Sequence, residues 1–173
     1  MANTYTLIAS NTLSSSAASV TFSAIPNTYT DLVLKVSART DAGGVNDYLN
    51  IRPNSDSTTI YSFTRLRGDG VSATSARGSG EIKISVDAMA TSGGTTNTFG
   101  SIEVYFPNYT TTANKPIASF GASEQNAASG PQIGVYANLF RNTSAISSLF
   151  LYRENGSNFL SDSSFFLYGI KNS

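Results

Sequence analysis

The chain lacks the residue types on which most catalytic sites depend. Its 173 residues include no histidine and no cysteine. Imidazole is the commonest general base, and thiolate is a common nucleophile and metal ligand. Ser-His-Asp and Cys-His sites are therefore impossible in this chain, and chemistry has to come from carboxylates, hydroxyls or aromatic rings.

Carboxylates alone can hydrolyse a glycosidic bond, because that reaction needs only two of them. Glu81, Glu103, Glu124 and Glu154 lie on or beside segments with strand-like alternation. The alternation around each places its side chain on the outward face, which is where solvated carboxylates belong. We therefore predict no catalytic residue and no enzymatic activity.

Four aspartates, Asp41, Asp47, Asp69 and Asp87, lie in or near glycine-rich loops. Carboxylate and carbonyl oxygens in such loops can hold calcium. The DxDxDG-like spacing of dedicated calcium loops is absent, and aspartate and glycine share turns for backbone reasons alone. We predict no metal and no cofactor, with calcium left as the open alternative.

Tyrosine is the remaining candidate for ligand contact. A set of tyrosines on predicted strands could form a sugar-stacking platform on one sheet: Tyr48, Tyr61, Tyr105, Tyr136 and Tyr152. The chain has no tryptophan, and tyrosine is favoured in strands in any case. Glycan binding is therefore a possible function that the tyrosines alone do not establish.

Charge excludes several partners. Lysine plus arginine number 11 and aspartate plus glutamate number 11, so the net charge is zero, and only 13% of residues are charged. A nucleic-acid binder would show a basic surplus, so we predict no nucleic-acid partner. The first residues, MANTYTLIAS, have no basic region and no long apolar run, and no window approaches 18 apolar residues. We expect no signal peptide and no membrane contact.

The clearest structural element is the segment Thr30–Thr40. Leu32, Leu34, Val36 and Ala38 share one face of the segment, and Val33, Lys35, Ser37 and Arg39 share the other, which is the period of a half-buried strand. We expect the first three side chains to be among the most buried in the protein. Further strands are predicted at Tyr5–Ala9, Ala18–Ala24, Tyr48–Arg52, Thr59–Leu66, Glu81–Val86, Phe99–Phe106, Pro116–Ser123, Gln132–Phe140, Ala145–Arg153 and Ser164–Ile170.

Polar and glycine-rich segments separate these strands. We predict turns at Ser10–Ser16 and Thr91–Asn97, a flexible loop over Gly68–Gly80, and one helical turn at Asp87–Ala90. Asn155-Gly156 predicts a type I′ hairpin turn. About ten short strands at regular spacing predict an all-β fold, an antiparallel β-sandwich resembling a jelly roll, formed by residues 1–173 as one domain.

The small-residue loops are the predicted partner contacts. Uncharged side chains pack against a neighbour without the cost of desolvating charge. The residues that we expect to contact a partner are Ser14, Ser15, Gly68, Asp69, Gly70, Arg77, Gly93 and Gly94.

Most of the chain resembles a family of small all-β structural proteins of tailed bacteriophages, particularly those of cyanobacterial and aquatic hosts. The resemblance lies in YTLIASNTLSSSAASVTFSAIPNTYTDLVLKVSARTD, in SIEVYFPNYTTTANKP and in the terminal FFLYGIKNS. Members of this group are capsid decoration or cement proteins, or tail and fibre components.

The resemblance implies a virion protein without catalytic residues. We expect a decoration or cement protein on the outer capsid surface. Its expected partners are the major capsid protein and other copies of itself, with which it would form a homotrimer. A receptor-binding tail or fibre module that recognises host-surface glycan is the alternative.

Overall fold

Every regular element in the described part of the chain is a β-strand. The computed structural model describes residues 4–126, 130, 132–153 and 155–171. The all-β prediction is confirmed, with twelve strands where about ten were expected, and these residues include no helix that could cross a membrane. The strands are β1 (Tyr5–Thr12), β2 (Ser19–Phe22), β3 (Asp31–Thr40), β4 (Asp47–Pro53), β5 (Tyr61–Gly68), β6 (Ala73–Glu81), β7 (Ile84–Thr91), β8 (Gly100–Phe106), β9 (Lys115–Ser123), β10 (Gln132–Phe140), β11 (Leu149–Tyr152) and β12 (Ser164–Ile170).

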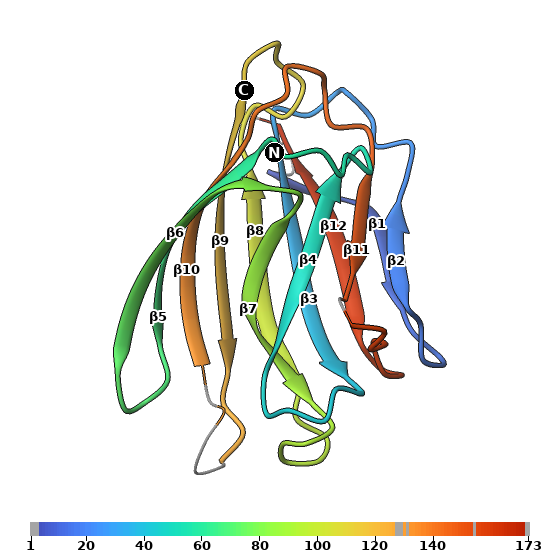
Figure 1. Cartoon of the computed structure of the whole chain (residues 1–173). Coiled ribbons are helices and arrows are strands. Elements are labelled where there is room, and N and C mark those ends of the chain that lie inside the picture. Colours follow the sequence, from blue (N-terminus) through green and yellow to red (C-terminus); the bar gives the residue numbers. More distant parts are fainter. Residues whose placement is uncertain (1–3, 127–129, 131, 154, 172–173) are drawn as a thin grey trace.

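The strands form two layers that meet at one corner. The long sheet has the order β1-β12-β3-β8-β9-β10-β5-β6, and the short sheet has the order β2-β11-β4-β7. Two parallel residue pairs between β3 and β7, Arg39 with Ala90 and Thr40 with Thr91, connect the sheets. Every other pairing between the named strands is antiparallel. In Figure 1, β4 and β7 cross in front of β3 and β8.

Strand β3 is central to the core, as predicted. Leu32 and Leu34 are fully buried and Val36 is 3% exposed. The strand pairs with β12 on one side and β8 on the other, so all of its central backbone groups lie inside the long sheet. On the opposite side of the strand, Lys35 and Ser37 are exposed as expected, but the outward placement of Val33 and Arg39 was wrong, because they are 1% and 6% exposed. Val33 lies between Tyr168 and Tyr105 on the paired strands, and the Arg39 guanidinium bonds to the turn after β7. Ile102, Val104 and Phe106, which alternate along β8, are buried as well.

Strand direction places half of the connections at one end of the sandwich. Each antiparallel pair joins an odd-numbered strand to an even-numbered one, so all odd-numbered strands run the same way. The connections that follow β1, β3, β5 and β7 therefore lie together, at the lower end in Figure 1.

Three inward-facing glycines bring the sheets into direct contact beside this end. A Cβ atom added at Gly100 would lie 2.1 Å from the Ala88 carbonyl oxygen, and one at Gly121 would lie 2.1 Å from the Asp87 carbonyl oxygen. Gly134 pairs directly with Gly121 and faces the Asp87 side chain. The backbone of β7 therefore rests on the backbone of the long sheet, an approach that no larger residue permits.

Replacing Gly121 by alanine is expected to lower the free energy of unfolding by about 1–3 kcal/mol or more, because the new methyl group must displace backbone. Gly43→Ala is the matched control, since a Cβ atom there meets nothing within 4 Å. The control should stay within about 0.5 kcal/mol of the wild type. Urea unfolding of both variants checks this, and equal stabilities would contradict the close approach.

The Gly68–Gly80 loop prediction is wrong. Residues Ala73–Glu81 form β6, which is antiparallel to β5. The residue pair next to the turn is Gly68 with Ala73, and the pairing continues to Tyr61 with Glu81. The intervening turn is short, because Asp69 Oδ1 accepts backbone hydrogen bonds from Val71 at 3.0 Å and Ser72 at 2.7 Å. Both hydrogen bonds lower the pKa of Asp69, and the bond from Ser72 has the larger effect. β6 is the last strand of its sheet and buries few side chains, so its sequence carries no alternation of hydrophobic residues.

Three smaller predictions also need correction. β1 continues to Thr12, so the turn predicted at Ser10–Ser16 starts later. Residues Asp87–Ala90 lie within β7 rather than in a helical turn, and one extra residue there forms a bulge against β4. Asn155 and Gly156 both have positive φ, as a type I′ turn requires, but β11 pairs with β2 and β4 and not with the segment after the turn.

Candidate interaction surface

Strands β5 and β10 have their polarity reversed over the part nearest the lower end. Their upper ends are conventional, with Tyr61 and Phe140 stacked in the core, ring centroids 5.0 Å apart. Further down, the side facing β7 carries Arg65 and Tyr136, whereas apolar side chains point away from the protein. A strand that covers its own core shows the opposite pattern.

The outward apolar side chains are neighbours across three strands. Phe120 of β9 pairs with Val135 of β10, and Val135 pairs with Leu66 of β5. These three are 42%, 46% and 55% exposed, and Ile133, two residues before Val135 on the same face of β10, is 53% exposed. We call these four residues the apolar patch. A contiguous exposed patch of this kind marks an interaction site more often than scattered apolar residues do.

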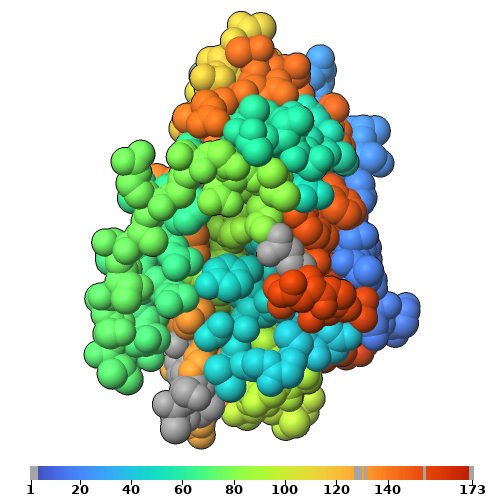
Figure 2. All heavy atoms as spheres, in the orientation of Figure 1, coloured from blue at the N-terminus to red at the C-terminus, as the bar shows by residue number. Residues whose placement is uncertain are grey.

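Grooves run over the patch. One groove, of about 620 Å³, is lined by Ala118 and Ala137 together with Leu66, Phe120 and Tyr105. A second groove, of about 270 Å³, lies along Leu66, Ile133 and Val135 toward Ala73 of β6. Figure 2 shows the green residues of β5 and β6 as the left flank of the molecule.

The side of the same strands that faces β7 holds a polar cluster. Asp87 is fully buried, and its Oδ2 lies 3.9 Å from Arg65 Nη1. Arg65 Nη1 also donates to the Tyr136 hydroxyl at 3.5 Å. Burial, and then the neighbouring Asp87 carboxylate, raise the pKa of Tyr136. Polar groups together with the Phe63 ring, whose centroid lies 6.1 Å from that of Tyr136, thus fill the space inside β5 and β10, and Leu66, Ile133 and Val135 are left outside.

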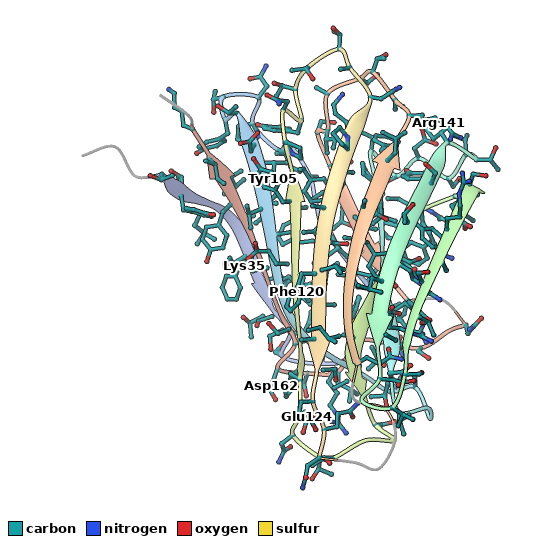
Figure 3. The ribbon with its side chains drawn as sticks, turned by 90° about the vertical axis from the view of Figure 1, so that its left-hand side faces the viewer. Lys35, Tyr105, Phe120, Glu124, Arg141 and Asp162 are labelled. Atoms are coloured by element: carbon teal, nitrogen blue, oxygen red, sulfur yellow. The ribbon has the colours of Figure 1, made fainter. Side chains whose placement is uncertain are left out.

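A polar border flanks the patch on the β3 side. In the residue row that contains Phe120, the next two positions are Glu103 and Lys35, whose charged atoms lie 2.9 Å apart. Hydrogen bonding to Glu103 raises the pKa of Lys35. Lys35, Tyr105 and Phe120, from β3, β8 and β9, are labelled in Figure 3. The Tyr105 hydroxyl donates to Asp31 Oδ2 at 2.8 Å.

The predicted contact residues do not form one site. Ser14 and Ser15 are exposed after β1, Gly68, Asp69 and Gly70 lie at the β5–β6 turn, and Gly93 and Gly94 lie between β7 and β8. Strand direction places these three connections at the same end of the sandwich. Arg77 is exposed within β6, paired with Thr64. Gly68 and Gly70 also border a groove of about 340 Å³ beside Ile133, so this turn adjoins the apolar patch.

The Gly93–Gly94 turn is held in place by the rest of the protein. The buried Arg39 guanidinium donates to the carbonyl oxygens of Thr95 at 2.6 Å and Thr98 at 2.9 Å. A Cβ atom at Gly93 would lie 2.4 Å from the Gly44 carbonyl oxygen. Such a turn is fixed before any partner arrives.

The residues considered for carboxylate chemistry are dispersed. Glu103 pairs with Lys35, Glu124 is exposed after β9, and Glu154 lies outside the described residues. Asp47 accepts from the Thr40 hydroxyl at 2.9 Å, while Asp41 accepts from the Asn158 side chain at 2.9 Å. Among the described residues, no group of three or more carboxylates is arranged to hold a metal ion.

The proposed tyrosine platform is not formed. Tyr61 and Tyr136 are 1% and 5% exposed and face the interior. Tyr48 and Tyr152 belong to the short sheet, and Tyr105 to the outer face of the long one. Tyr105 and Tyr136 both line the groove over the apolar patch, and of these two Tyr105 is partly exposed whereas Tyr136 is buried.

Comparison with known proteins adds no relative. No family model matches the chain, and no curated protein sequence matches it.

Proposed function

We propose that the protein is a non-enzymatic structural protein of a tailed-phage virion, a capsid decoration or cement protein that binds the outer capsid and stabilises contacts between capsid subunits. The observation that carries the proposal is the outward-facing apolar patch, because a protein acting alone in water gains nothing from exposing it. The resemblance of the N-terminal, central and terminal segments to phage structural proteins supplies the virion context.

The order of the strands supports a jelly-roll interpretation of the core. Taken alone, β1-β12-β3-β8 faces β2-β11-β4-β7, and the chain passes repeatedly between these two four-stranded sheets. Two such sheets of eight strands are the jelly-roll arrangement. The remaining four strands are inserted as β5–β6 and β9–β10, and they extend the long sheet beyond β8. We call these four strands the extension.

The mechanism we propose is burial of apolar surface at several equivalent junctions. Each contact contributes a modest free energy, which symmetry repeats over the shell and simultaneous contacts reinforce. A surface with almost no charge suits this, because burying charge costs more than burying hydroxyl and aliphatic groups. The major capsid protein and other copies of the chain are the partners in this proposal.

Antibody against the recombinant chain, applied with gold labelling to intact phage particles, tests the proposal. Labelling over the outer surface of heads is the expected result. Particles that lack the chain should rupture at a lower temperature or after milder osmotic shock. Particles unlabelled on head and tail would overturn the virion role, and unchanged rupture would overturn the cement role.

A glycan-binding tail or fibre module is the second candidate, and one group of side chains favours it. Tyr5 and Tyr168 lie edge to face with ring centroids 6.2 Å apart, on the outer face beside Lys35. Gold labelling over tails, with glycan-array binding that is lost in Tyr168→Ala, would favour this candidate over capsid decoration.

A further inference from the structure

We propose that the apolar patch on the extension is the contact surface for a second copy of this chain, which packs its own patch against it face to face across a two-fold axis. The inference rests on the proposed structural role but not on location in a virion. It names the occupant of the surface described above.

The reversal of polarity shows that the outer side of the extension is built to be covered. Leu66, Phe120, Ile133 and Val135 are each about half exposed, while their chain neighbours on the β7 side are polar residues or glycines. Both hairpins contribute to the patch, and neither is required to complete the two opposed four-stranded sheets. The extension thus adds to the core a sheet face whose apolar side has no cover within the described chain.

The shape of the surface favours another sheet as its cover. Side chains of paired strands form rows, and rows of this kind interdigitate with those of an opposing sheet about 10 Å away. Across the patch, Phe120, Val135 and Leu66 form one row, and Ala122, Ile133 and Gly68 form the next. A second copy brings the same two rows.

The charge distribution permits self-association. The patch residues carry no charge, and the nearest pair, Lys35 and Glu103, neutralise each other at 2.9 Å. The chain as a whole has a net charge of zero. Two copies therefore approach without repulsion, and a two-fold arrangement places the identical apolar groups in contact, as in most homo-oligomers.

The available area is of the right order. Half-exposure of four large side chains amounts to roughly 400 Å² of apolar surface. One partner of a standard stable interface contributes about 800 Å² in total, apolar and polar together. The floor and walls of the grooves, with Ala118, Ala137 and Tyr105, continue the same face toward that size.

Sedimentation velocity of the purified full-length chain, from low micromolar to several hundred micromolar, is the first test. The wild type should sediment as a dimer at the higher concentrations. Raising the salt concentration should change the dissociation constant less than about two-fold, because no charge is paired across the interface. A wild type that stays monomeric throughout, or forms a trimer, overturns the two-fold pairing.

Val135→Glu is the decisive variant, because it puts two carboxylates close together at the centre of the contact. The dissociation constant should rise about 100-fold or more. Thr21→Glu is the matched control, on the exposed side of β2 in the short sheet, and should dimerise like the wild type. Circular dichroism of each variant verifies folding, and Val135→Thr, which keeps a β-branched residue, provides a milder version of the same change.

Mixing Val135→Glu with Val135→Lys identifies the occupant. If position 135 faces position 135 of the second copy, the mixture should form a heterodimer although each variant alone is monomeric. Failure of the mixture to associate, or a Val135→Glu variant that dimerises normally, overturns the proposal. If the purified protein is monomeric but its antibody still labels phage heads, this inference has failed and the proposed function has not.

Discussion

Replacing Leu34 by alanine is expected to lower the free energy of unfolding by about 2–5 kcal/mol. Leu34 is fully buried at the middle of β3, between Leu167 of β12 and Val104 of β8. Removal of its isobutyl group loses the transfer free energy of the buried carbons and leaves a cavity. Paired backbones on both sides prevent β3 from moving to fill that cavity, which places the cost toward the upper part of the range.

Urea unfolding monitored by circular dichroism measures the change. Ser37→Ala provides the control on the same strand, since Ser37 is exposed and forms part of the outer face. Its free energy of unfolding should lie within about 0.5 kcal/mol of the wild-type value. A Leu34→Ala cost no larger than that of the control would show that the faces of β3 were assigned the wrong way round.

The core strands were predictable because both of their sides have a defined environment. β8 and the middle of β3 face the short sheet on one side and solvent on the other, and their alternation follows directly. Nothing in the alternation reveals that Val33 and Arg39, on the outer side of β3, are covered. The same physics explains why β6 was taken for a loop. Its pairing with β5 depends on backbone hydrogen bonds and one tight turn at Asp69, and neither leaves a hydrophobic period in the sequence.

The sequence shows the β10 part of the apolar patch only as an alternation of apolar and other residues, which does not tell which face of the strand is buried. Ile133, Val135 and Ala137 share one face of β10, and periodicity cannot say whether that face is inside or outside. The opposite face contains Gly134, whose pairing with Gly121 marks a close approach of β7. Only the pairing of β9, β10 and β5 shows that these glycines point inward and therefore that the apolar face points out.

Whether the predicted loop residues contact a partner stays a prediction, but small residues at one of these turns have a steric reason. A Cβ atom at Gly93 would meet the backbone of Gly43 and Gly44, and one at Gly94 would meet the Gln125 side chain. Steric constraint and flexibility select the same residue types, so composition cannot separate them. The close contact of Gly93 with Gly44 and the hydrogen bonds from Arg39 show that this turn is sterically constrained rather than flexible.

Strongly alkaline solution is expected to unfold the protein through its buried tyrosines. Burial raises the pKa of Tyr61, Tyr109 and Tyr136 in the folded state. Their side chains are at most 5% exposed, and the Tyr61 hydroxyl donates to the Asp56 carbonyl oxygen at 2.8 Å. A phenolate at these positions would have to be desolvated, so the folded protein retains three protons that an unfolded chain releases.

The sign follows from that difference in bound protons. The stabilising contribution of the three hydroxyls is fully present below about pH 10, the pKa of tyrosine in an unfolded chain, and is lost as the pH rises above it. Each retained proton makes the free energy of unfolding fall by about 1.4 kcal/mol per pH unit. Lys115, whose pKa burial lowers, acts in the opposite sense, but only until about pH 10.4, where an unfolded lysine has also lost its proton.

Three tyrosines together should therefore lower the free energy of unfolding by about 4 kcal/mol per pH unit above this point. Urea unfolding at a series of alkaline pH values measures that slope, and tyrosinate absorbance should show the buried group ionising only as the protein unfolds.

Tyr61→Phe keeps the stacked ring and removes one ionisable hydroxyl. It should be less stable near neutrality by about 0.5–1.5 kcal/mol, since one hydrogen bond is lost, yet its alkaline slope should be about one third smaller than that of the wild type. A wild-type stability that stays flat above pH 10 would mean that these hydroxyls reach water in the folded state, contrary to their burial between the two sheets.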